Sequence, residues 1–172
     1  MQTRPTVLLV AAAALALAAC GTDPGVGPTP VPTPAAVFRT GDVIALQADT
    51  GRYLSRIRRD GLDPVEAAKD GIDASSRFRV TVLENDTIAL AADNGQYLSR
   101  IRRSDNDPVE AAKPAIDAFS RFTVTLLDEH TLALRADNGL YLSRIRRGDL
   151  DPVEAAKATI DPNSRFRITR LQ

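Results

Sequence analysis

Residues 92–103 read ADNGQYLSRIRR, and nearly the same run recurs at residues 48–59 and 136–147. Two further motifs, DPVEAAK and SRF, return with the same offset. The chain therefore carries three ungapped copies of one 44-residue unit, which span residues 44–87, 88–131 and 132–172. A fixed period of this length is typical of proteins built from internal structural repeats.

Each copy is predicted to consist mainly of β-strands. In the first copy, residues 44–48 and 77–82 alternate between apolar and polar side chains, which is the period of a strand with one buried face. Residues 53–57 form a second short strand, and Asp49-Thr50-Gly51 before it is a turn signal. Polar residues at 84–86 and 128–130 form the turns between copies.

The segment Asp63–Lys69 is compatible with two structures. An extended strand would bury Val65 and Ala67 on one face. A short helical turn is also possible, because Asp63 suits an N-cap and Pro64 suits the first helical position. We favour the strand and leave the helical turn open.

Three such units can stack as an open solenoid or close on themselves. A solenoid needs atypical end repeats to protect its edges, whereas the third copy here is as regular as the second. Residues 37–43 precede the first copy and can pair with the final strand, and closure would remove the exposed strand edges. The sequence therefore predicts an all-β domain at residues 37–172, a β-trefoil with pseudo-three-fold symmetry.

The repeat also resembles the fascin-type β-trefoil family of actin-crosslinking modules. Residues 88–98 (IALAADNGQYL) and 132–142 match the repeat of that family, and residues 44–54 match with Thr50 in the asparagine place. The closing phenylalanine of the repeat corresponds to Phe78, Phe122 and Phe166. The resemblance implies the trefoil fold. It does not imply actin bundling, because this chain has a single trefoil and carries an export signal.

The first 36 residues are predicted to be an export signal and a linker. Arg4 and the apolar run from Thr6 to Leu17 form a signal peptide, residues 1–19, which is too short for a comfortable membrane span. The closing Leu-Ala-Ala-Cys-Gly resembles a bacterial lipobox, so Cys20 is expected to carry a lipid that anchors the protein to the cell membrane or outer membrane. Residues 20–36 are rich in proline and predict a semi-rigid spacer. The folded body is then extracytoplasmic.

The composition argues against several classes of function. The formal net charge is zero, whereas a nucleic-acid-binding domain would carry a basic excess. Cys20 is the only cysteine and His130 the only histidine, so no cysteine–histidine pair and no zinc site is expected. No phosphate-binding glycine loop or serine–histidine–aspartate spacing is present. We therefore expect a non-catalytic protein without a cofactor.

Two explanations remain for the charged residues that are identical in all three copies. The first is three equivalent binding sites for an extracellular or cell-envelope glycan or protein. Their residues would be Tyr53, Arg56, Arg58 and Asp63; Tyr97, Arg100, Arg102 and Asp107; and Tyr141, Arg144, Arg146 and Asp151. The alternative is a structural envelope lipoprotein without a soluble ligand, in which the repeated charges form a stabilising lattice of ion pairs.

Overall fold

A computed structural model describes residues 37–172, and each copy contributes four strands to it. The strands of the first copy are β1 (Val43–Gln47), β2 (Tyr53–Arg56), β3 (Val65–Lys69) and β4 (Phe78–Val82). Those of the second are β5 (Thr87–Ala91), β6 (Tyr97–Arg100), β7 (Val109–Lys113) and β8 (Phe122–Leu126). Those of the third are β9 (Thr131–Arg135), β10 (Tyr141–Arg144), β11 (Val153–Lys157) and β12 (Phe166–Arg170). Short 3-10 turns precede the last strand of each copy, at η1 (Ala74–Ser76), η2 (Ala118–Ser120) and η3 (Pro162–Ser164).

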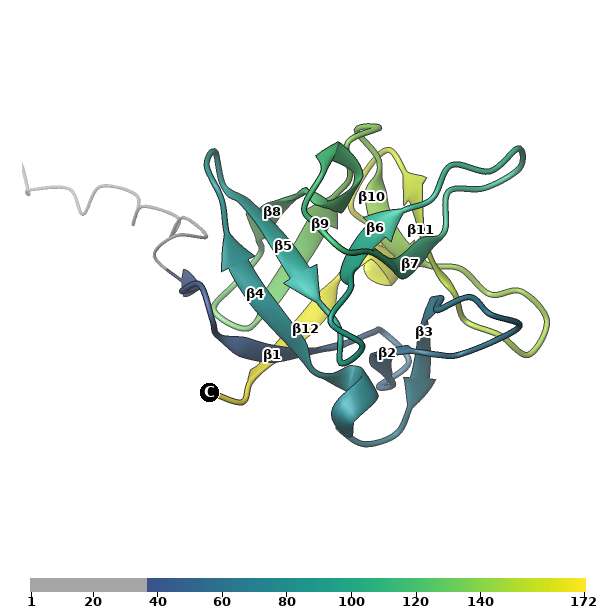
Figure 1. Ribbon diagram of the computed structural model, residues 1–172, viewed down its shortest axis with the longest axis horizontal. Helices are drawn as coiled ribbons and strands as arrows, with labels where there is room; N and C mark the ends of the chain where they lie inside the picture. The colour runs from purple at the N-terminus through teal and green to yellow at the C-terminus, as the bar shows by residue number, and fades with distance from the viewer. Residues whose placement is uncertain (1–36) are drawn as a thin grey trace, which may run out of the picture. The chain divides into compact units, whose positions relative to one another are not determined.

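The first and last strands of the three copies form a closed antiparallel barrel (Figure 1). The strands pair in the order β1–β4–β5–β8–β9–β12, and β12 returns to β1 with Ile168 opposite Leu46. Closure leaves no unpaired barrel edge. The predicted closed β-trefoil is confirmed, and the open solenoid is not formed.

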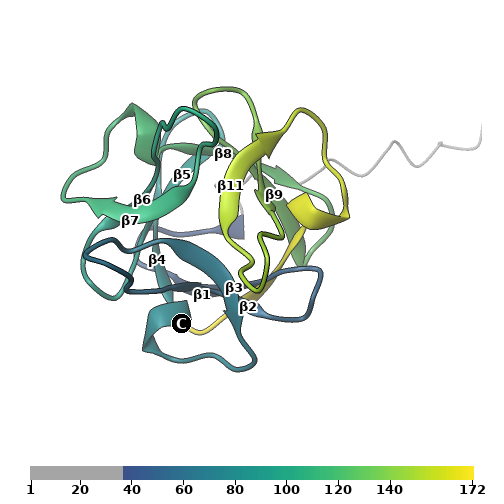
Figure 2. The same cartoon turned by 90° about the vertical axis from the view of Figure 1, so that its right-hand side faces the viewer.

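The second and third strands of each copy form a hairpin, and the three hairpins gather around the pseudo-three-fold axis (Figure 2). The amide of Ala67 donates to the carbonyl of Asp151 in the third copy at 2.9 Å. Ala111 and Ala155 make the equivalent bonds to Asp63 and Asp107. Each hairpin is therefore hydrogen-bonded to a hairpin of another copy.

The core fills the barrel with side chains from all three copies. Phe78, Phe122 and Phe166 are fully buried, and Phe38 joins the same cluster. The two-residue alternation explains this arrangement: Phe78 and Val80 point inward, whereas Arg79 between them is exposed. Because the closed barrel and its whole described core lie within residues 37–172, this segment contains a complete folding unit.

The segment that could have been a helical turn is strand β3. Val65 and Ala67 are buried in the core, and β3 pairs with β2 along its length. The hairpin pairs the backbone of the segment and places Val65 and Ala67 on one face, whereas residues two apart point to different sides of a helix. Hairpin pairing therefore outweighs the local helix-start signal.

The segment before β1 differs in part from expectation. The prediction that residues 37–43 pair with the final strand is wrong except at Val43, whose carbonyl accepts from the Leu171 amide at 2.9 Å; strand β1 makes the pairing, from Ile44 to Gln47. The residues before it lie against β4 instead: the amide of Gly41 donates to the Val80 carbonyl at 2.9 Å, and the amide of Val82 donates to Thr40 Oγ1 at 3.0 Å. The predicted turn is confirmed by positive φ angles at Gly51, Gly95 and Gly139.

The signal peptide, Cys20 and the proline-rich linker lie outside the described residues. Among residues 37–172 there is no helix that is long and apolar enough to cross a membrane.

Candidate functional site

The first group of predicted site residues lies at the seams between copies. Arg56, at the end of β2, donates through Nε and Nη2 to both carboxylate oxygens of Asp93 in the second copy, at 2.6 and 2.9 Å. Its Nη1 donates to Asp63 Oδ1 in its own copy, at 2.6 Å. The planar guanidinium group suits this arrangement, because it presents several donors in a fixed fork. One arginine thus holds two carboxylates from different copies.

The same arrangement occurs at the other two seams. Arg100 binds Asp137 and Asp107, and Arg144 binds Asp49 and Asp151. The pairs run from the first copy to the second, from the second to the third, and from the third back to the first. They therefore form a ring of ion pairs around the body, which we call the seam lattice.

The seam lattice is partly buried, and this affects the charged groups. The side chains of Arg56, Arg100 and Arg144 are 17%, 7% and 12% exposed. Hydrogen bonds from Arg144 lower the pKa of Asp49 below its usual value, and those from Arg56 lower the pKa of Asp93. Low exposure and bidentate geometry make these pairs stronger than ordinary surface salt bridges.

A second set of ion pairs surrounds the pseudo-three-fold axis. Glu66, Glu110 and Glu154 are buried, and each pairs with the arginine seven positions earlier in its own copy. These pairs and three prolines, one from the DPVEAAK motif of each copy, line a depression of about 240 Å³. The carboxylates in it are neutralised by their own arginines.

Invariant serines also have a structural explanation. The hydroxyl groups of Ser55 and Ser76 lie 3.0 Å apart in the interior, and Ser76 Oγ donates to Asp73 at 3.0 Å. Asp73 in turn pairs with Lys69 at 3.1 Å. The other copies repeat this chain. It links each hairpin to the 3-10 turn before the next barrel strand.

The structure does not bring all predicted site residues together. Arg56 and Asp63 are in contact, as are their copies, but they are occupied by the seam lattice. Arg58, Arg102 and Arg146 are exposed in the loops between the hairpin strands, and they make no ion pair within residues 37–172. Tyr53 lies elsewhere, on the outer surface of the barrel, where β2 begins next to Gln47 of β1.

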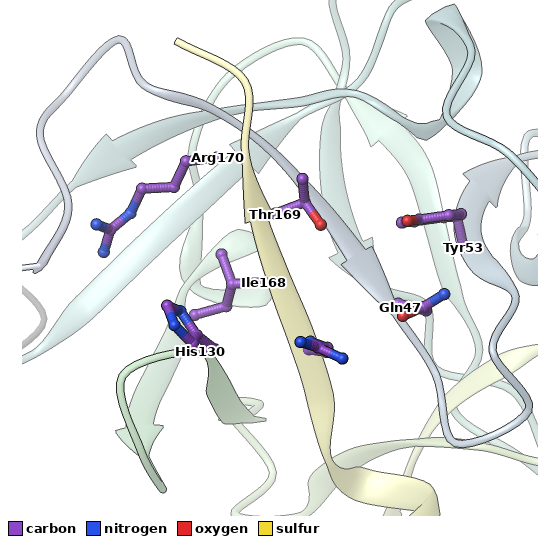
Figure 3. A pocket seen from close by; sticks show the side chains of 7 residues that line it. Gln47, Tyr53, His130, Ile168, Thr169 and Arg170 are labelled. Atoms are coloured by element: carbon purple, nitrogen blue, oxygen red, sulfur yellow. The ribbon is translucent and has the colours of Figure 1, made fainter.

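Tyr53 borders an open depression of about 470 Å³ on this outer surface (Figure 3). Gln47, Arg167 and Thr169 line the depression with it, and His130 lies at its border, in an exposed turn. Arg56, Arg58 and Asp63 do not line it. The predicted grouping of tyrosine with these three residues is therefore not formed in this depression.

The register of the barrel places the tyrosine in a row with an arginine. In the row around Tyr53, Arg167 of β12 is opposite Gln47 of β1, which is opposite Tyr53. The equivalent rows are Arg79–Ala91–Tyr97 and Thr123–Arg135–Tyr141. Neighbouring side chains on one face of an antiparallel sheet lie roughly 4.5–5.5 Å apart at Cβ. We call these the outer rows; each contains one tyrosine and one arginine.

Sequence analysis missed the non-tyrosine members of the outer rows. Gln47, Arg167, Arg79 and Arg135 occupy positions that vary between copies, so a search for invariant residues passes over them. The signal that could have found them is the strand alternation, which places Arg79 and Arg167 on the exposed face of their strands. The residues of one row come from different copies and meet only when the barrel closes, so the sequence of a single strand does not reveal the row.

Within residues 37–172, no three histidine, cysteine, aspartate or glutamate side chains gather into a group that could hold a metal ion. Asp60 and Asp63 lie near each other in the sequence but do not form a shared site. Asp63 belongs to the seam lattice, whereas Asp60 is an exposed turn residue with φ 51°. The outer rows, by contrast, offer a ligand the planar hydrogen-bond donors of an arginine and the aromatic ring of a tyrosine.

No family model matches the chain, and no curated protein matches it in sequence. Solved structures share its fold. The designed three-fold symmetric protein ThreeFoil matches with a TM-score of 0.65 and 18% identity, covering 75% of this chain and 99% of ThreeFoil. A Polyporus squamosus lectin bound to a human-type influenza-binding epitope matches with a TM-score of 0.64 and 11% identity, covering 78% of this chain and 50% of the lectin. The SDF2-like protein from Arabidopsis thaliana matches with a TM-score of 0.61 and 14% identity, covering 75% of this chain and 92% of the SDF2-like protein.

At these identities the likeness shows the fold alone. The β-trefoil of three repeats is thus established both by the strand pairing and by these structures. The resemblance to fascin-type modules in particular stays a prediction.

Proposed function

We propose that this chain is a surface-anchored, non-catalytic binding module that recognises an extracellular or envelope glycan through the three outer rows. The observation that carries the proposal is the recurrence of a tyrosine with an arginine on three sides of one rigid barrel. An aromatic ring beside a few polar donors is the usual make-up of a site for a small polar ligand such as a sugar unit. One structure of similar fold is a lectin, which supports the proposal by analogy only.

Three equivalent sites also suit a repetitive ligand. A shallow, open depression such as that at Tyr53 offers weak binding on its own. Several weak sites on one body can raise the apparent affinity for a polymer by a factor of about 10²–10⁴, because the second and third contacts become intramolecular. A polysaccharide displays the same unit many times and would benefit from this geometry.

Binding is tested with residues 37–172 on an array of polysaccharides. We expect the wild-type fragment to bind at least one glycan. The triple variant Tyr53→Ala, Tyr97→Ala, Tyr141→Ala should then lose roughly 100-fold in apparent affinity, the scale of the lost avidity. The matched triple change to phenylalanine keeps the rings and should retain most of the binding. Melting temperatures of both variants show whether a loss reflects unfolding.

The anchor is the second part of the proposal, and it rests on the Leu-Ala-Ala-Cys-Gly sequence that ends at Gly21. The change Cys20→Ser in the full chain is expected to move the protein from the membrane fraction to the soluble fraction of the producing cells, because the lipid has no other attachment site. Retention in the membrane fraction would contradict lipid anchoring. The folded body is unaffected by this change, since its described core begins at Phe38.

The alternative function is a structural envelope lipoprotein without a soluble ligand. The seam lattice favours it, because ion pairs account for many of the invariant charges. An array on which residues 37–172 bind no glycan and capture no envelope component would support this alternative over the binding module.

A further inference from the structure

Most acidic side chains of the described body are paired with an arginine or a lysine, and two invariant sets of arginines have no such partner: the loop set Arg58, Arg102 and Arg146, and a second set beside the barrel strands. Arg77, Arg121 and Arg165 lie between the 3-10 turn and the last strand of each copy, and all three are exposed. Within residues 37–172 their side chains make no salt bridge and no hydrogen bond. The seam lattice occupies Arg56, Arg100 and Arg144, and the ion pairs around the axis occupy Arg59, Arg103 and Arg147. Neither set of pairs includes the three exposed arginines.

The outer rows show a compensation that points to a required positive charge. The first and third rows carry Arg79 and Arg167 on the last strand of a copy. The second row has Thr123 at that place, and its arginine is Arg135, on the strand directly opposite. Every row therefore keeps one arginine on the same outer face, although the strand that supplies it changes.

At one outer row, an arginine of this set and a row arginine border the same surface. Arg77 and Arg79 line one depression of about 690 Å³. Asp93, which is bound by Arg56, and the chain end at Gln172 also line this depression. Arg79 makes only a long contact of 3.4 Å, to the carbonyl of Gly41.

The depression at Tyr53 is basic. Arg167 and Arg170 line it, with Arg170 on the Ile168 side of β12, and its lining contains no acidic side chain (Figure 3). Since the chain as a whole is formally neutral, the depression at Tyr53 is a local concentration of positive charge.

We infer that the three outer rows, together with Arg77, Arg121 and Arg165, bind the carboxylate or sulfate groups of an acidic polysaccharide. This inference rests on the proposed function and names its ligand class. The guanidinium fork binds carboxylate and sulfate oxygens through paired hydrogen bonds. The tyrosine of each row contacts the neighbouring sugar ring. The loop arginines Arg58, Arg102 and Arg146 lie outside the rows and serve as a natural comparison set.

The test measures binding of residues 37–172 to polygalacturonate, dextran sulfate and uncharged dextran. The variant Arg77→Gln, Arg121→Gln, Arg165→Gln removes three charges from the proposed sites. The matched variant Arg58→Gln, Arg102→Gln, Arg146→Gln removes three exposed charges elsewhere. We expect the first variant to bind the preferred acidic polymer at least tenfold more weakly, and the second at most twofold more weakly. Both should melt like the wild type, because these side chains are exposed and unpaired.

Each outcome has a defined meaning. Preference for polygalacturonate assigns carboxylate groups to the sites, and preference for dextran sulfate assigns sulfate groups. Equal losses in the two variants, or equally tight binding of duplex DNA, would overturn the inference in favour of unspecific attraction to polyanions. If residues 37–172 bind uncharged glycans, and the variant at Arg77, Arg121 and Arg165 binds them as tightly as the wild type, the inference is wrong but the proposed function stands. Failure to bind any glycan would remove both.

Discussion

Replacing Arg100 by alanine is expected to lower the free energy of unfolding by about 2–3 kcal/mol, which corresponds to a fall in melting temperature on the order of 10 °C. The Arg100 side chain is 7% exposed and binds both Asp107 and Asp137, so its removal leaves two partly buried carboxylates without their partner. Phe119 also loses the guanidinium that lies 5.2 Å from its ring centre. Thermal unfolding of residues 37–172, followed by circular dichroism, measures the change.

The matched control is Arg102→Ala, two positions further along the chain. Arg102 is exposed and has no ion pair among the described residues, so the expected change is below about 0.5 kcal/mol. If the two variants melted at the same temperature, the seam lattice would not stabilise the body. The invariance of Arg100 would then need another cause, such as direct contact with a ligand.

Replacing Phe122 by alanine is expected to have the largest effect on the body, about 3–5 kcal/mol of unfolding free energy. Phe122 is fully buried at the first position of β8, inside the barrel. The change removes a ring that contacts the central cluster and leaves a cavity that the rigid barrel cannot fill. Because small domains are stable by only about 5–15 kcal/mol, this loss should bring unfolding into a much lower range of urea concentration.

Phe119→Ala is the control for this change, since it removes the same ring three residues earlier. Phe119 is 38% exposed and lies over Arg100 and Lys113. Its loss should cost less than about 1 kcal/mol, in line with an exposed cation–π contact. Equal urea midpoints for the two variants would contradict the placement of Phe122 in the core.

Much of the fold could be predicted from the repeat alone. The alternation in residues 77–82 indicates which side chains face the core, and Phe78 and Val80 lie there. The glycine of each Asp-x-Gly turn has the expected positive φ. Both predictions succeed because they depend on neighbours within a few residues. Local preference does not decide between a strand and a helical turn at Asp63–Lys69, because the outcome depends on pairing within the hairpin.

The roles of the charged residues could not be predicted in this way. Arg56 pairs with Asp93, which is 37 positions away and belongs to the next copy. The invariance of both residues is visible in the sequence, but their contact exists only because three copies close around an axis. For the same reason, Tyr53 was grouped with the nearby Arg56 and Arg58, whereas barrel register places it in a row with Arg167 from the end of the chain.

If the proposed function is right, the same closure separates the residues that stabilise the body from those that bind a ligand. Charged residues that point along the seams, such as Arg100, are occupied by carboxylates and should affect melting. Residues on the outer face, such as Arg77 and Tyr97, have no such partner and should affect binding. Seam-lattice variants are therefore expected to lower the melting temperature, whereas outer-face variants are expected to lower the affinity for the glycan and leave the melting temperature unchanged.

The central claim is that three equivalent outer rows bind one repetitive glycan. The most direct test removes the tyrosines cumulatively: Tyr53→Ala alone, then together with Tyr97→Ala, then with Tyr141→Ala as well. For each variant, the affinity is measured for the polysaccharide that residues 37–172 bind most tightly. We expect the affinity to fall at each step, by similar factors whichever row is removed first, with folded protein throughout. Affinity equal to the wild type in the triple variant, or complete loss after one particular substitution only, would contradict the claim.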